Sequence, residues 1–117
     1  MNSKQKGCRG EREFAALCRE HGIESAQRGQ QFSGGHDSPD VKGLPGYHVE
    51  VKRVERLNIN EAMKQSIRDS EGKAIPIVAH RRNREPWLVT MLADDWLSLY
   101  KNWKNNCGQA SQICEIE

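Results

Sequence analysis

Three residues in the middle of the chain have the types and spacing that metal-dependent hydrolysis needs. Asp40 follows a proline, and Glu50 and Lys52 lie further along in the pattern Glu-Val-Lys. Residues two apart on a strand project from one face, so Glu50 and Lys52 should stand side by side. Two carboxylates placed together repel each other, and a divalent cation between them removes that conflict. Hard oxygen ligands suit Mg²⁺, for which Mn²⁺ can substitute, and the lysine could orient or activate a water. The pattern predicts metal-assisted hydrolysis of a phosphodiester.

A hairpin must bring the two carboxylates together. Segments 40–43 and 47–52 flank a Leu-Pro-Gly turn, and the second arm alternates apolar and polar residues. A three-residue loop, Leu44–Gly46, sets Asp40 opposite Glu50, whereas a two-residue loop shifts it out of register unless a bulge intervenes. We expect the odd-length loop or a bulge, with both carboxylates on one face. The alternative is a surface strand with ordinary solvated charges.

The other elements predict an α/β fold, in which helices flank a mixed sheet in the order α-β-β-β-α-β-β-α. Apolar spacing and turn residues indicate helices at 10–21 and 60–71, a last helix from Asp94 or Asp95, and strands at 23–28, 74–79 and 87–92. Pro76 should lie at the start of its strand, where no ladder donor is needed. We assign residues 1–103 to a single domain and residues 104–117 to a polar C-terminal tail.

Length, composition and net charge exclude several classes of protein. A chain of 117 residues fits one domain, which leaves no room for a cofactor-binding domain and predicts no nucleotide cofactor. The sequence shows no apolar run of membrane-spanning length and no signal-peptide stretch at its start, which favours the cytoplasm and no membrane partner. Apolar residues make up only 36%, which leaves room for burial against a partner subunit. The net charge of +2 means that any nucleic-acid surface must be local.

Pro39-Asp40 followed by Glu50-Val51-Lys52 resembles the PD-(D/E)-x-K nuclease signature. The opening segment KGCRGEREF, residues 6–14, resembles the K-G-x-x-x-E-R-E start of archaeal-type Holliday-junction resolvases, which also occur in phages. The resemblance spans roughly residues 6–92 in element order. It implies a restriction-endonuclease-like mixed β-sheet flanked by helices. It also implies a homodimer that resolves four-way DNA junctions by paired symmetric nicks with Mg²⁺, in a bacterial, archaeal or phage-infected cell.

Carried over by position, the resemblance implies roles for individual residues. Asp40, Glu50 and the backbone carbonyl of Val51 would bind the metal, with Glu11 as a further ligand and Lys52 as the catalytic lysine. Glu13 is the alternative to Glu11. On the second helix, Gln65 resembles a glutamine that positions water or phosphate in several such nucleases, and its alternative is a solvated helix residue. The side chains predicted to contact DNA are Arg9, Arg28, Ser33, Arg53, Arg56 and Gln65.

The sequence therefore predicts a single nuclease domain that acts on branched DNA, with Glu11, Asp40, Glu50 and Lys52 as its catalytic residues. A nuclease of the same fold acting on duplex, nicked or flapped DNA would use the same site chemistry, so the motifs do not separate the two. The alternative from another class is a non-catalytic DNA-binding module of the same fold.

Overall fold

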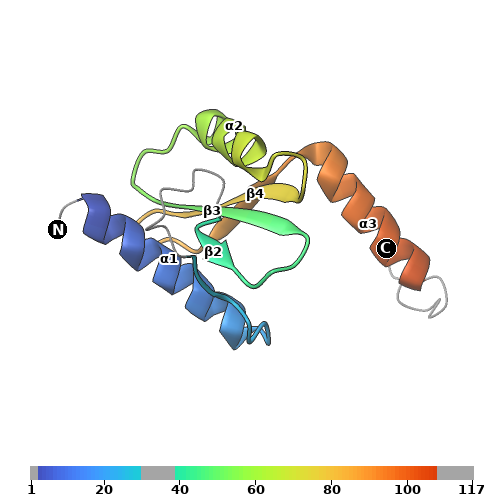
Figure 1. The fold of residues 1–117 in the computed structure, drawn as a ribbon, viewed down its shortest axis with the longest axis horizontal. Coiled ribbons are helices and arrows are strands. Elements are labelled where there is room, and N and C mark those ends of the chain that lie inside the picture. Colours follow the sequence, from blue (N-terminus) through green and yellow to red (C-terminus); the bar gives the residue numbers. More distant parts are fainter. Residues whose placement is uncertain (1–2, 30–38, 108–117) are drawn as a thin grey trace.

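The computed structural model describes residues 3–29 and 39–107, with side chains of the first helix described from Cys8 onward. The elements in chain order are α1 (Ser3–Glu20), β1 (Gln27–Arg28), β2 (Val41–Lys42), β3 (Tyr47–Arg53), α2 (Ile59–Ser70), β4 (Ile75–Arg81), β5 (Leu88–Met91) and α3 (Ala93–Cys107) (Figure 1). The strands form one sheet in the order β1-β2-β3-β4-β5. The β3–β4 pair is parallel and the other pairs are antiparallel, so the predicted α/β class with a mixed sheet is confirmed.

The sheet lies between α1 and α2, which cover its two faces (Figure 1). Phe14, Ala15 and Cys18 of α1 pack in one core with Val49 and Val51 of β3. A smaller core joins residues of α2 to β4 on the other side. Because neighbouring residues of a strand face opposite ways, the residues between and beyond these valines, from His48 to Lys52, turn toward α2. The α2 face of β3 is therefore where the predicted chemistry must lie.

Helix α1 begins at Ser3, seven residues before the predicted start at Gly10. The predicted start lies too late, because glycine is a poor helix former and propensity alone disfavours Gly10 inside a helix. Packing explains its presence inside the helix: a Cβ at Gly10 would lie 2.6 Å from Cβ of Arg53. The missing side chain lets α1 approach β3 closely. The predicted stop at Gly22 agrees with its positive φ of 93°.

Several other boundaries differ by a few residues. Strand β1 covers only Gln27–Arg28 rather than the predicted 23–28. Helix α2 begins at Ile59, one residue before the predicted start, and its N-cap is Asn58, whose side chain accepts a hydrogen bond from the backbone N–H of Glu61. Pro76 is the second residue of β4, before the stretch that pairs with β5, which confirms the predicted placement at the strand start.

Helix α3 extends to Cys107, four residues into the segment predicted to be tail. The remaining tail residues, 108–117, lie outside the described part of the chain. No described residue of α3 is buried, and the helix projects beyond the sheet as an arm (Figure 1). Within the described residues, no helix has the length and apolarity needed to cross a bilayer.

Candidate metal centre

The hairpin register brings Asp40 to Glu50. Val41 pairs with Val49, which is the register that the three-residue loop predicts. The Asp40 carboxylate is anchored over β3, because its Oδ2 accepts a hydrogen bond from the backbone N–H of Val51 at 2.8 Å. The carboxyl groups of Asp40 and Glu50 share a hydrogen bond. The expectation that both carboxyls meet on one side of the sheet is therefore confirmed.

Glu50 is a buried acid in an unfavourable environment. Only 2% of the residue is exposed. Burial is the main cause that raises its pKa, and the Asp40 carboxylate raises it further, while the hydrogen bond with His48 at 2.9 Å opposes both. The net result raises the pKa of Glu50 to about 7. A cation placed beside this carboxylate would favour its charged form.

Glu11 reaches the same region from α1. Its carboxylate accepts a hydrogen bond from Nε of Arg28 at 2.8 Å. Burial raises the pKa of Glu11, the bond to Arg28 lowers it, and the nearby Asp40 carboxylate raises it again. Glu13, the alternative candidate, binds Arg9, Arg53 and Arg81 instead. The geometry therefore favours Glu11 over Glu13 as the acid that α1 contributes beside Asp40.

A second group of donors shares Glu50. His48, Glu50 and Asp69 each offer a ligand atom, and these atoms lie within 4.8 Å of one another. Asp69 comes from α2, four residues after Gln65, and residues four apart on a helix share a face. One imidazole nitrogen and two carboxylates form a triad that could hold a metal ion. Sequence reasoning missed Asp69, although its spacing from Gln65 was a usable signal.

Lys52 is held in place by Gln65. Nζ of Lys52 donates a hydrogen bond to Oε1 of Gln65 at 3.0 Å. Both side chains are half-buried, between the α2 face of β3 and α2 itself. Gln65 is therefore tied to the predicted catalytic lysine and is not merely a solvated helix residue.

The side chains predicted to contact DNA lie in several different places. Arg28 is bound to Glu11, and Arg9 is exposed and bound to Glu13. Arg56 is exposed and lines a cleft beside the centre. Ser33 lies outside the described residues.

Arg53 does not face the centre, and its assignment as a DNA contact stays a prediction. It follows Lys52 on β3 and so turns to the opposite face, toward α1. Its guanidinium is buried and donates to Glu13 at 3.0 Å and to Asn83 at 2.7 Å. The side chain ties α1 to the sheet.

The described residues thus place carboxylates, an imidazole, a lysine and a glutamine around β3. Hard oxygen donors dominate the set, which suits Mg²⁺ or Mn²⁺. In comparisons with known proteins, no family model, curated protein or solved structure matches the chain.

Proposed function

We propose that this protein is a metal-dependent endonuclease of the PD-(D/E)-x-K type that cuts branched DNA. One observation carries the proposal. The carboxyls of Asp40 and Glu50 are in contact, and Lys52 lies two residues from Glu50, tied to Gln65. The strand spacing places Lys52 on the same face as Glu50. This is the arrangement that the PD-(D/E)-x-K resemblance requires, on a mixed α/β sheet that is compatible with a restriction-endonuclease-like fold.

The donors fit a divalent cation. Asp40, Glu50 and the Val51 carbonyl would hold it, with Glu11 beside them. Burial and the Asp40 carboxylate raise the pKa of Glu50 to about 7, and His48 opposes them only in part, so a further positive charge would favour the ionised carboxylate. When bound, Mg²⁺ would supply that charge, bind a phosphate oxygen and make a water more acidic. His48 and Asp69 offer further donors on the other side of Glu50.

The side chains of the chain itself would orient the reaction. Lys52 orients or activates the water that attacks the phosphorus in line with the leaving oxygen, and its ammonium offsets charge on the phosphate. Gln65 would act as a positioning residue, because its side-chain oxygen accepts a hydrogen bond from Nζ of Lys52. Arg56, exposed beside the centre, would contact the phosphate backbone.

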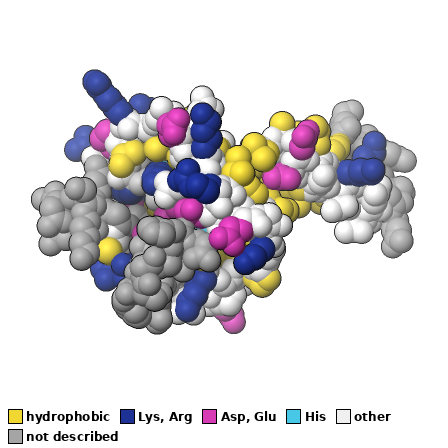
Figure 2. All heavy atoms as spheres, turned by 45° about the horizontal axis from the view of Figure 1, so that its top comes forward, with side chains coloured by type: hydrophobic (Ala, Val, Ile, Leu, Met, Phe, Trp, Pro, Cys, Tyr) yellow, Lys and Arg dark blue, Asp and Glu magenta, His cyan; other side chains and the backbone are white. Residues whose placement is uncertain are grey.

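Resolution of a four-way junction needs two symmetric cuts, which a two-fold dimer supplies. An exposed apolar stripe runs along α3 and the residue before it, at Leu92, Trp96, Leu99 and Trp103. These residues follow the alternating spacing of four and three that forms a coiled-coil seam. Figure 2 shows hydrophobic side chains along this arm and where it leaves the sheet. We propose that a second copy of the chain covers this stripe.

The test is cleavage of matched DNA substrates of the same sequence: a four-way junction, a flap, a nicked duplex and a linear duplex. We expect the junction to be cut preferentially with Mg²⁺ and not with EDTA. Asp40→Asn should abolish cutting, whereas Asp94→Asn, a matched change at an exposed acid of α3, should not. Equal cutting of all substrates would contradict the selectivity for branched DNA. Binding without cutting by the wild type would establish a non-catalytic module.

A further inference from the structure

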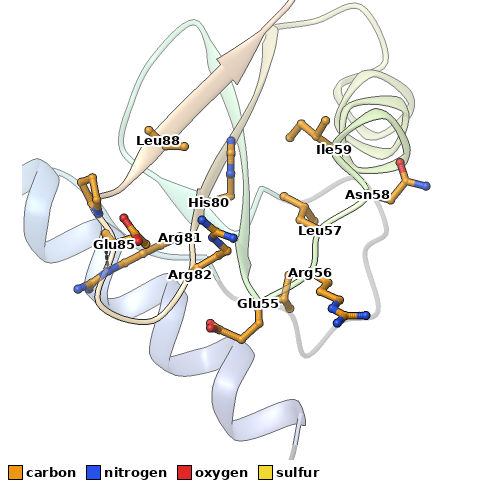
Figure 3. Close-up of a pocket in the computed structure, with 12 residues that line it drawn as sticks. Glu55, Arg56, Leu57, Asn58, Ile59, His80, Arg81, Arg82, Glu85 and Leu88 are labelled. Atoms are coloured by element: carbon orange, nitrogen blue, oxygen red, sulfur yellow. Dashed lines mark hydrogen bonds between the residues drawn. The ribbon is translucent and has the colours of Figure 1, made fainter.

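An open cleft adjoins the metal centre. It has a volume of about 850 Å³ and lies between the segment before α2 and the β4–β5 turn (Figure 3). In the sheet, Lys52 pairs with His80, and His80 pairs with Leu88. Paired residues on neighbouring strands share a face, so these three form one row across the α2 face. His80 and Leu88 line the cleft, which therefore begins about 5 Å, one strand spacing, from Lys52.

The inner part of the cleft is lined by apolar side chains and by the imidazole ring of His80. Leu57 and Ile59 point in from one side and Leu88 lies on the other, with His80 between them (Figure 3). Nε2 of His80 is hydrogen-bonded to the Thr90 hydroxyl at 2.8 Å, and burial lowers the pKa of this imidazole. The ring is therefore neutral near pH 7, and its surroundings suit an uncharged, flat, apolar group.

The mouth of the cleft offers positive charge. Arg56 and Arg82 line it and are exposed, and within the described part of the chain their guanidinium groups form no hydrogen bond or salt bridge. The Glu55 carboxylate, by contrast, accepts from the backbone of Asn83 at 2.7 Å. A neutral backbone N–H does not cancel the charge of Glu55, and Glu85 and Arg81 also line the cleft, so among the described residues three arginines stand against two acids around it. An anionic group is favoured at this entrance.

We propose that the cleft binds one unpaired nucleotide of the DNA strand, next to the phosphate that lies at Lys52. This inference rests on the proposed nuclease function. The base would lie between Leu57 and Leu88 over His80, and its phosphate would meet Arg56 and Arg82. A nucleotide combines a flat apolar base with an anionic phosphate. The base matches the apolar inner part of the cleft, and the phosphate matches the arginines at its mouth. The volume is ample for a ligand of this size.

The nucleotide must be unpaired, because stacking and pairing cover both faces and the edge of a base inside a duplex. Extrusion of a base costs least where it is already unpaired. A flap supplies such nucleotides directly. In a four-way junction the bases are paired, but strands change helix at the branch point, so we expect extrusion of a base there to cost less than inside linear duplex, and capture in the cleft would select branched substrates.

The experiment places 2-aminopurine, a base whose fluorescence changes when it leaves the stack, at each position within two nucleotides of the cut in a four-way junction. Binding is measured on the full chain without divalent cation, by anisotropy of a distant label and by 2-aminopurine fluorescence. We expect one flanking position to respond to the wild-type protein. Leu88→Gln and Arg82→Gln should abolish that response and weaken junction affinity about fivefold or more, the lower range for a stacked base.

Two neighbouring substitutions are matched controls. Val89→Gln changes an equally exposed residue on the other face of β5, and Arg84→Gln changes an arginine of the same turn that does not line the cleft. Both should behave as the wild type. Junction binding with no fluorescence response, or with a response that the two cleft variants leave intact, would overturn the nucleotide site alone. Failure of the wild type to bind DNA would overturn the proposed function as well.

Discussion

Glu50 is the residue on which the two groups of metal donors converge. It shares a hydrogen bond with Asp40 on one side and joins His48 and Asp69 on the other. Burying a carboxylate beside another acid destabilises its charged form, which is why its pKa is raised. A cation bound there would relieve this unfavourable environment, so we expect metal binding to stabilise the fold through this side chain.

A pH-dependent cost to stability follows from this raised pKa. The pKa of Glu50 is near 4.5 in the unfolded chain and about 7 in the fold. The neutral carboxyl therefore contributes fully to the free energy of unfolding below pH 4.5, and this contribution is lost as the pH rises to about 7. In EDTA at pH 8, Glu50→Gln should therefore be more stable than wild type, by about 3 kcal/mol at most. The difference should vanish near pH 4. Thermal unfolding measured across this pH range checks it, and a variant that is less stable at pH 8 would contradict the burial argument.

The bond between Gln65 and Lys52 makes a separate prediction at the residue scale. Gln65→Ala frees the ammonium group, so we expect kcat for DNA cleavage to fall about tenfold or more through loss of orientation. KM for DNA and binding of Mn²⁺ should stay close to wild type, because Gln65 is not expected to touch either. Single-turnover kinetics and Mn²⁺ titration separate these effects.

The exposed neighbour Lys64 provides the control for that measurement. Lys64→Ala leaves the Lys52 contact intact and should keep full activity. Equal activity of the Gln65 variant and the wild type would show that the hydrogen bond does not position the lysine.

At the scale of elements, α1 is joined to the sheet by a close approach and an ion-pair network. Gly10 lies against Arg53, and Glu13 binds both Arg53 and Arg81. These contacts place Glu11, one residue after Gly10, beside Asp40. Helix α1 thus positions Glu11, a proposed metal ligand, and also forms a layer of the fold.

Gly10→Ala should disturb this packing, because the added methyl group meets Cβ of Arg53, next to the backbone, rather than a flexible side-chain end. We expect a loss of about 1–3 kcal/mol in the free energy of unfolding, in the range for overpacked sites. Urea unfolding measures it. Arg12→Ala, at an exposed position of the same helix, should change stability little, and an equally small effect at Gly10 would contradict the close packing.

At the level of the whole chain, helix α3 exposes large apolar side chains, and none of its described residues is buried. Trp96 and Leu99 are 52% and 44% exposed, although both are large and apolar. Tyr100 stacks between Trp96 and Trp103, which aligns the aromatic rings along the helix. Apolar surface of this extent is expected to be buried against a partner.

A double substitution in this stripe tests the dimer. Trp96→Glu with Leu99→Glu should convert a dimer into a monomer in sedimentation experiments, because the charges would be buried in the seam. The variant should still nick a junction, but the two nicks should become uncoupled. Lys101→Glu, off the stripe on the same helix, should remain dimeric. A wild type that sediments as a monomer at high concentration would contradict the proposed pairing.

The local sequence determined much of the centre. Loop length set the register of Asp40 against Glu50, because antiparallel pairing counts residues from the turn. Strand alternation placed Glu50 and Lys52 on one face in the same way. The helix and strand types followed from apolar spacing, with errors mainly at the ends, where packing outweighs propensity.

Only the tertiary structure decided which distant side chains join that centre. Asp69 reaches Glu50, and Gln65 reaches Lys52, because α2 packs across β3 at one particular rotation. Arg53 binds Glu13, which lies forty residues away on α1, and no local pattern could indicate that pairing. Local patterns fix which face a residue takes within its own element, whereas the docking of one element on another depends on the fit of whole surfaces.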